Sequence, residues 1–207
     1  MKIIVFGSTG SVGKHLVKQA LEKGYEVTAF ARDTSKIKVN HPNLFKVSGD
    51  VLNPNDVESA ISSHDAAMVV LGAGRKGEVR AKGTQNVIQA MKSQGISRLI
   101  CQSTLGAGDS YSNLNFFWKH IMFGMLLRPA YADHQLQEQV VKQSGLDWTI
   151  VRPGAFTDGE FTGQYRHGFS VNDKSTKLKV SRSDVADFLL TQLIDKSYLH
   201  KTPGLSY

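Results

Sequence analysis

The chain lacks the features that mark a disulfide-stapled, membrane-spanning or metal-binding protein. Its 207 residues hold one cysteine, Cys101, so no disulfide can form within the chain. A thiol inside the apolar run 99–101 is most simply buried and unreactive. The most apolar segment, 116–127, is too short to span a bilayer and carries Lys119 and His120 inside it. The seven histidines occur singly rather than in paired spacings, so we expect no metal site.

A concentrated basic stretch is also absent. The 25 Lys and Arg residues exceed the 18 Asp and Glu residues, which gives a formal net charge of +7. The basic residues are scattered singly over the expected helices and loops, without the run that is typical of a nucleic-acid site. We therefore expect a small phosphorylated or carboxylated molecule as the partner, and no nucleic acid.

Internal repeats and long polar tracts are missing as well. A chain of this length with 41% hydrophobic residues favours one well-buried domain over residues 1–207 rather than two independent ones. Met1 leads directly into an apolar run, so we expect no signal peptide and a cytoplasmic location. The sequence leaves the oligomeric state open.

The feature that is present from the start is a glycine-rich turn. Residues 1–13 read M-K-I-I-V-F-G-S-T-G-S-V-G, and a helical pattern over 12–23 follows, which predicts a strand, a tight turn and a helix. The N-terminus of such a helix directs unpaired N–H groups and a positive dipole end at the turn, which suits a pyrophosphate. The alternative is that the glycines serve only the turn. The cofactor-binding candidates in this stretch are Gly7, Ser8, Thr9, Gly10, Ser11, Val12 and Gly13.

Strand and helix patterns then alternate along the chain. Apolar and β-branched runs predict strands over 25–31, 43–47, 66–71, 98–102 and 147–151. Helices are predicted over 53–62, 78–93 and 131–144, and from 181 onward. This alternation predicts an α/β fold with a single Rossmann-type doubly wound parallel sheet flanked by helices. Ligands of such sheets bind outside the carboxyl ends of the strands.

The end of the second predicted strand indicates which dinucleotide is bound. NAD sites place a carboxylate there for the ribose 2′-hydroxyl, whereas an Arg accommodates the 2′-phosphate of NADP. Here Arg32 and Ser35 follow the strand, and Asp33 lies beyond the tip, where it is expected to cap the turn. We predict NADP(H) as the cofactor, with Arg32 on the adenine or the 2′-phosphate. The alternative is a solvated surface arginine.

The other strand ends supply the remaining cofactor candidates. Asp50 faces the adenine edge or caps a turn; the flexible stretch 71–74 is expected beside the ribose and phosphates. Ser103 is expected next to the nicotinamide, and its alternative role is a turn or helix cap. The rigid and then flexible loop 152–156 lies at the same edge. The cofactor candidates here are Asp50, Val51, Leu71, Gly72, Ala73, Ser103, Pro153, Gly154, Ala155 and Phe156.

Two segments are predicted to form a substrate pocket, 104–130 and 153–170. Within the first, the aromatic and methionine-rich run 116–127 forms part of the core, a pocket wall or a subunit interface. Within the second, residues 160–165 form a lid or a small terminal strand. Trp118 and His134 are the candidate substrate contacts.

Taken together, these motifs carry a resemblance to a known family. The stretches G-S-T-G-S-V-G at 7–13, A-R-D at 31–33, G-D-V at 49–51 and S-R-L-I-C-Q-S-T at 97–104 resemble the atypical short-chain dehydrogenases/reductases. So do S-G-L-D-W-T-I-V-R-P-G at 144–154 and S-R-S-D-V-A at 181–186, and the resemblance spans essentially the whole chain. The N-terminus, the Asp133-His134 pair and T-G-Q-Y at 162–165 are most similar to the flavin reductase/biliverdin reductase B family.

The departures from that family bear on the chemistry. Ordinary short-chain dehydrogenases use a Tyr-x-x-x-Lys pair, but these positions fall on Ala130 and His134 here, and Tyr131 is one residue out of register. The Pro-Pro-His loop of the biliverdin reductase B family reads Pro153-Gly154-Ala155, so the role of its histidine does not transfer. The serine on the fifth strand does transfer, to Ser103.

The resemblance implies an NADPH-dependent reductase that transfers hydride to flavins (FMN, riboflavin) and to biliverdin-type linear tetrapyrroles, with Ser103 as the catalytic residue. The missing Tyr and Lys leave a second hypothesis, a non-catalytic NADP(H)-sensing regulatory or assembly protein of the NmrA-like branch. They also disfavour a nucleotide-sugar epimerase. Because fold alone supports all of these, the function has to be argued from the site.

Overall fold

A computed structural model describes residues 1–75 and 77–207 of the chain. Its centre is a sheet of the order β3-β2-β1-β4-β5-β6-β10-β8. All neighbouring pairs in it are parallel except β8 with β10. The crossovers run outward from β1 in both directions, so the predicted doubly wound parallel sheet is confirmed.

The strands of this sheet are β1 (Lys2–Phe6), β2 (Glu26–Ala31), β3 (Leu44–Ser48), β4 (Ala66–Val69), β5 (Arg98–Gln102), β6 (Asp147–Pro153), β8 (Arg166–His167) and β10 (Gly204–Ser206). A separate parallel pair consists of β7 (Ala155–Thr157) and β9 (Lys179–Ser181). The α-helices are α1 (Gly13–Glu22), α2 (Pro54–Ile61), α3 (Val79–Ser93), α4 (Arg128–Lys142) and α5 (Arg182–Thr191). Shorter helical turns are η1 (Thr34–Lys36) and η2 (Gly108–Asn113), and η3 (Phe117–Leu126) is a π-helix.

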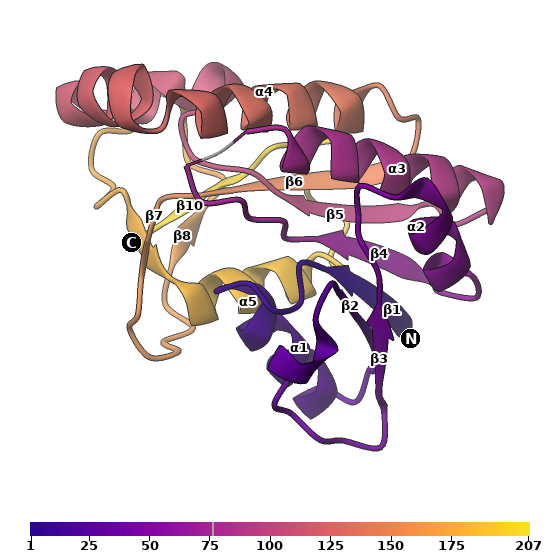
Figure 1. The fold of residues 1–207 in the computed structure, drawn as a ribbon. Coiled ribbons are helices and arrows are strands. Elements are labelled where there is room, and N and C mark those ends of the chain that lie inside the picture. The colour runs from indigo at the N-terminus through magenta and orange to yellow at the C-terminus, as the bar shows by residue number, and fades with distance from the viewer. Residues whose placement is uncertain (76) are drawn as a thin grey trace.

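Helices cover both faces of the sheet, with α3 and α4 on one side and α1 and α5 on the other (Figure 1). The central strands are fully buried because both faces pack against helices, which explains their continuous apolar sequences. The apolar side chains form one core under α1 and α5 and a second under α2, α3 and α4. A third, small cluster lies apart from both, where Phe123 of η3 packs with Leu105 and Leu114. No helix in the described part of the chain has the length and apolar content needed to cross a bilayer.

The turn from β1 into α1 is built by backbone contact. Gly7 has φ +91°, and a Cβ there would lie 2.5 Å from the carbonyl oxygen of Val70 beside β4. A Cβ on Gly13 would overlap the carbonyl oxygen of Gly7. Glycine at these two positions therefore brings the start of α1 against the end of β1.

Helix α4 is fixed to the rest of the fold by two buried carboxylates. Asp133 accepts hydrogen bonds from the backbone N–H groups of Arg80 and Ala81, 3.0 Å each, and so caps the N-terminus of α3 from a different helix. Glu138 accepts two hydrogen bonds from Arg152 of β6, at 2.8 and 2.6 Å. The arginine is 1% exposed, so this ion pair lies inside the protein. The two contacts set where α4 stands relative to the strand ends.

Several segments differ from the predictions made from sequence. Residues 160–165 form no strand, and their role as a lid stays a prediction; the carboxylate of Asp184 holds this loop by accepting hydrogen bonds from the N–H groups of Thr162 and Gly163. Helix α4 starts at Arg128 rather than 131, because η3 runs directly into it and Pro129 occupies its first turn, where no N–H is required. Strands β7, β8, β9 and β10 were not predicted, since each is very short, and β7 begins within the predicted loop 152–156.

We expect Gly13→Ala to lower the free energy of unfolding by at least about 3 kcal/mol, because backbone rather than a flexible side chain blocks the new methyl group. Urea denaturation measures the change. Gly72→Ala is the matched control: no atom lies within 4 Å of its added Cβ, so a change under about 1 kcal/mol is expected. Equal effects of the two substitutions would contradict the packing argument.

Glu138→Ala should lower the free energy of unfolding by about 3–5 kcal/mol, because it leaves the Arg152 charge buried without its main partner. Its control is Glu22→Ala, which removes an exposed i,i+4 contact with Lys18 at 3.8 Å and should change stability by no more than about 0.5 kcal/mol. A small loss at Glu138 would show that the pair does not fix α4.

Candidate functional site

Two adjoining cavities lie at the carboxyl ends of the parallel strands. We call them the β1–β2 cavity, of about 650 Å³, and the strand-tip cavity, of about 360 Å³. They share Gly10, Leu71 and Gly72, so together they form one path across the sheet edge. This is the edge at which a doubly wound sheet binds its ligands.

The β1–β2 cavity is lined by the glycine turn and by the ends of β2, β3 and β4. Its lining includes the predicted cofactor residues Gly7, Thr9, Gly10, Arg32, Asp50, Val51, Leu71, Gly72 and Ala73. Asp50 also accepts a hydrogen bond from the N–H of Leu52 at 3.0 Å, so it caps the turn as one of its two expected roles, and its place at the adenine edge stays a prediction. Asp33 caps the next turn as predicted, by accepting from the N–H of Ser35 at 3.1 Å. Arg32 is thus the cation that β2 brings to this cavity.

The glycine turn presents mainly backbone to the cavities. Gly10 N–H donates to the carbonyl of Gly7 at 2.9 Å, which closes the turn. Among the described residues no side chain caps the N-terminus of α1. An anion resting on the turn would supply what a capping side chain usually does, since helix N-termini bind anions.

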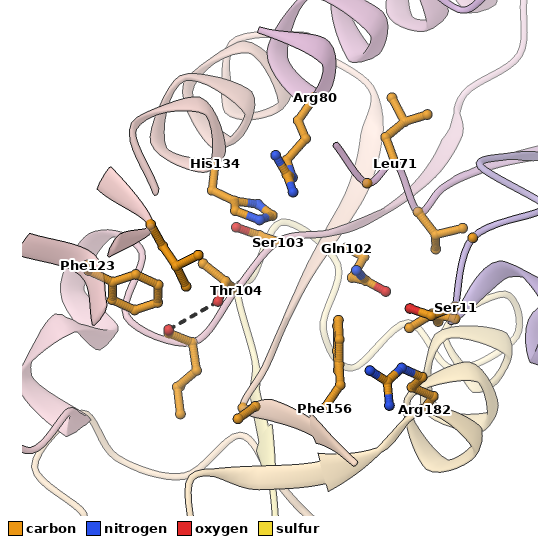
Figure 2. Close-up of a pocket in the computed structure, with 18 of the residues that line it drawn as sticks. Ser11, Leu71, Arg80, Gln102, Ser103, Thr104, Phe123, His134, Phe156 and Arg182 are labelled. Carbon is orange, nitrogen blue, oxygen red and sulfur yellow. Dashed lines mark hydrogen bonds between the residues drawn. The ribbon is translucent and has the colours of Figure 1, made fainter. Parts of the chain in front are cut away.

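Several polar groups converge on the strand-tip cavity. Gln102 is the last residue of β5 and Ser103 follows it; they are 6% and 2% exposed, and His134 reaches the cavity from α4 (Figure 2). Within the described residues Gln102 Oε1, Ser103 Oγ and His134 Nδ1 are buried without a hydrogen bond of good geometry. Leaving a buried polar atom unsatisfied costs about 1–3 kcal/mol, so three such atoms on one cavity point to a bound ligand.

His134 is neutral at physiological pH. Burial, together with the positive charge of Arg80, lowers the pKa of His134 to about 4. Arg80 itself is held by Asp133 through an ion pair of 3.4 Å and lines the same cavity. The cavity therefore contains a neutral imidazole, which can donate one hydrogen bond and accept another but does not readily give up a proton at pH 7.

The far wall of the cavity is apolar. It is formed by Leu105, Leu114, Trp118, Phe123, Leu127 and Leu178. Phe123 stacks on Tyr131 with ring centroids 4.7 Å apart, and the Tyr131 hydroxyl donates to the carbonyl of Gly106 at 2.9 Å. That hydroxyl is already used in a structural contact, and Ala130 offers no acid. The Tyr and Lys of ordinary short-chain dehydrogenases thus have no counterpart on this wall.

The structure brings most of the predicted site residues to the two cavities. Those on the strand-tip cavity are Gly10, Ser11, Val12, Leu71, Gly72, Ser103, Trp118, His134, Gly154, Ala155 and Phe156. Four predicted cofactor residues line neither cavity: Ser8, Gly13, Ser35 and Pro153. Ser8 Oγ donates to the carbonyl of Phe30 at 2.9 Å, and Ser35 Oγ donates to Asp33 at 2.6 Å, so these hydroxyls serve the fold. Their part in cofactor binding stays a prediction.

Both predicted pocket segments reach the strand-tip cavity, through Thr104 to Leu127 and through Gly154 to Phe156, but residues 157–170 do not line it. The sequence reasoning missed Arg80, Gln102 and Arg182. Arg182 had a signal, because it stands in S-R-S-D directly at the start of the last helix. Arg80 had none, since its position depends on Asp133 of another helix.

Comparison with known proteins agrees with this geometry. A family model described as NAD(P)H-binding matches residues 7–196. A UPF0659 protein of Saccharomyces cerevisiae is 30% identical over 206 residues, which cover 94% of this chain and 87% of that protein. The photosystem II assembly factor Ycf39 of Cyanophora paradoxa is 26% identical over 212 residues, covering 95% of this chain and 60% of that protein. Among solved structures, ChuY, an anaerobillin reductase of Escherichia coli O157:H7, has the same fold: its TM-score is 0.83 at 24% identity, over 100% of this chain and 97% of that one.

We expect the His134 ring to titrate with a midpoint near pH 4 when followed by NMR, and the signal to vanish in His134→Gln. Because the pKa of the folded state lies below the ordinary value of 6.5, the unfolded chain binds more protons in acid. Stability from the neutral ring is therefore complete above about pH 6.5 and is lost as the pH falls toward 4. A midpoint near 6.5 would mean that the ring is open to water.

Proposed function

The chain belongs to the NAD(P)H-binding family, and we propose that it is an NADPH-dependent reductase that transfers hydride to flavins such as FMN and riboflavin and to biliverdin-type linear tetrapyrroles. The observation that carries this proposal is the strand-tip cavity. It joins the cofactor path at one end, ends in an apolar aromatic wall at the other, and holds unsatisfied polar atoms between them. The family match confirms a nicotinamide dinucleotide as the cofactor.

The two cavities suggest how the chain would hold NADP(H). The β1–β2 cavity suits the adenosine half, with Arg32 at the 2′-phosphate and no carboxylate at the tip of β2 to favour NAD. The backbone of residues 8–12 suits the pyrophosphate. Gly154 to Phe156 lie where they would hold the carboxamide of the nicotinamide. Arg32 thus carries the preference for NADPH over NADH.

The residues around the acceptor mainly supply orientation. NADPH supplies the hydride when bound, and the chain contributes proximity and a dry, apolar surface for a flat conjugated acceptor. Ser103 Oγ would donate a hydrogen bond to the acceptor or to a water molecule. His134 is neutral and Tyr131 is already bonded to Gly106, so we place the final proton in solvent. Net charge +7 attracts flavin phosphate or bilin propionates.

The similar proteins include both a named reductase and a named assembly factor. ChuY is named an anaerobillin reductase, which supports reductase chemistry in this fold. Ycf39 is named an assembly factor, which favours a protein that senses NADP(H) without catalysis. Ala130 and His134 in place of Tyr and Lys are compatible with both. The strand-tip cavity places Ser103 and Gln102 beside an apolar, aromatic wall, and this combination favours the reductase because a flat conjugated acceptor needs both polar contacts and an apolar surface.

The test is the absorbance of reduced nicotinamide with the purified protein, NADPH and each acceptor in turn: FMN, riboflavin and a biliverdin. NADH in place of NADPH is the control for cofactor choice. Consumption that requires an acceptor and prefers NADPH supports the reductase. Tight NADPH binding without consumption by any acceptor would reject it and support the sensor.

Ser103→Ala should lower turnover by about tenfold, the effect of losing one hydrogen bond to the acceptor, while the Kd for NADPH stays nearly unchanged. Steady-state rates and a fluorescence titration with NADPH measure the two quantities. Ser59→Ala serves as the control, because the Ser59 hydroxyl donates to the carbonyl of Asn55 on α2 and Ser59 lines neither cavity. If turnover is the same in Ser103→Ala as in the parent protein, the catalytic role of Ser103 is wrong.

A further inference from the structure

Arg182 lies at the strand-tip cavity next to the glycine turn. It is the first residue of α5, and it lines the cavity together with Gly10, Ser11 and Val12. Figure 2 shows its guanidinium group beside Ser11 and Phe156. The carbon at the centre of that group lies 5.5 Å from the centre of the Phe156 ring, which holds the side chain over the cavity.

The guanidinium group has one carboxylate partner, and its buried Nε–H has none among the described residues. Nη1 donates to the Asp158 carboxylate at 2.6 Å. The other nearby carboxylate, Asp184, is occupied by Thr162, Gly163 and the hydroxyl of Tyr207. Asp158 is therefore the counter-ion that Arg182 has in this structure.

Asp158 holds Arg182 only weakly. Its side chain is 92% exposed, and exposed ion pairs contribute about 0–1 kcal/mol. It also lies on the loop between β7 and β8, whose anchor to Asp184 begins at Thr162. Asp158 can thus leave Arg182 without disturbing that anchor.

From these contacts we propose that Arg182 binds the pyrophosphate of the dinucleotide beside the glycine turn, and that Asp158 occupies the guanidinium group until the cofactor arrives. The glycine turn offers backbone N–H groups, and the described sequence of this turn, residues 7–13, contains no lysine or arginine. Arg182 supplies the missing positive charge, with Nε and a terminal nitrogen spaced for two parallel bonds to a phosphate. The inference rests on the cofactor site of the proposed function and not on its acceptor.

The proposal separates Arg182 from Arg32 by the part of the cofactor that each one holds. Arg182→Gln should raise the Kd for NADPH about tenfold or more, and leave unchanged the Kd for adenosine 2′-monophosphate, which has no pyrophosphate. Arg32→Gln should weaken both ligands. The Kd of Arg182→Lys for NADPH should lie between those of the parent protein and Arg182→Gln, because lysine keeps the positive charge but cannot donate two parallel hydrogen bonds. Asp158→Asn should bind NADPH as tightly as the parent protein or more tightly, since it removes the competing carboxylate.

These Kd values are measured by fluorescence titration and by displacement, with urea denaturation of each variant alongside. Unchanged NADPH binding in both Arg182 variants overturns the proposal, as does an equal loss of NADPH and adenosine 2′-monophosphate. A parent protein that does not bind NADPH overturns both this inference and the proposed function. Failure of every acceptor to be reduced removes only the proposed function, because the binding measurements do not depend on hydride transfer.

Discussion

The position of helix α4 at the candidate site depends on one buried ion pair, between Arg152 of β6 and Glu138 of α4. Two charges taken out of water need good geometry and saturated hydrogen bonding, and this pair has both, with Asp109 as an additional partner of the arginine. The pair fixes α4 on the sheet. The same helix then places Asp133 on the N-terminus of α3 and His134 on the cavity. The ion pair therefore sets the position of His134, although neither of its own two residues lines the cavity.

Backbone atoms form most of one half of the site, and side chains form most of the other. The cofactor half consists largely of backbone: a turn packed through Gly7 and Gly13, and strand ends whose spacing is set by the hydrogen bonds of the sheet. The acceptor half consists of side chains from η3 and of the neighbouring Leu105, Leu114 and Leu127, packed in their own small cluster. The first half depends on the fold, whereas the second depends on which side chains are present.

The parts of the fold that follow local rules could be predicted from sequence. The first six strands in chain order, the cofactor edge and the capping role of Asp33 follow from apolar runs, glycine positions and turn chemistry. The prediction failed where distant contacts decide. The strand alternative for residues 160–165 was wrong because Asp184 holds this loop, and Arg80 was missed because Asp133 of another helix places it. None of these contacts leaves a periodic or compositional signal in the chain.

Because the small apolar cluster is separate from the two main cores, its residues can be substituted with little effect on those cores. Leu114, Trp118, Phe123 and Leu127 contact the acceptor space and one another, and the sheet does not need them to stay folded. A mutant library confined to these four positions should therefore contain mostly folded members that still hold the dinucleotide. Natural substitutions in and next to this one π-helix could in the same way change the acceptor while the sheet and its dinucleotide site stay the same.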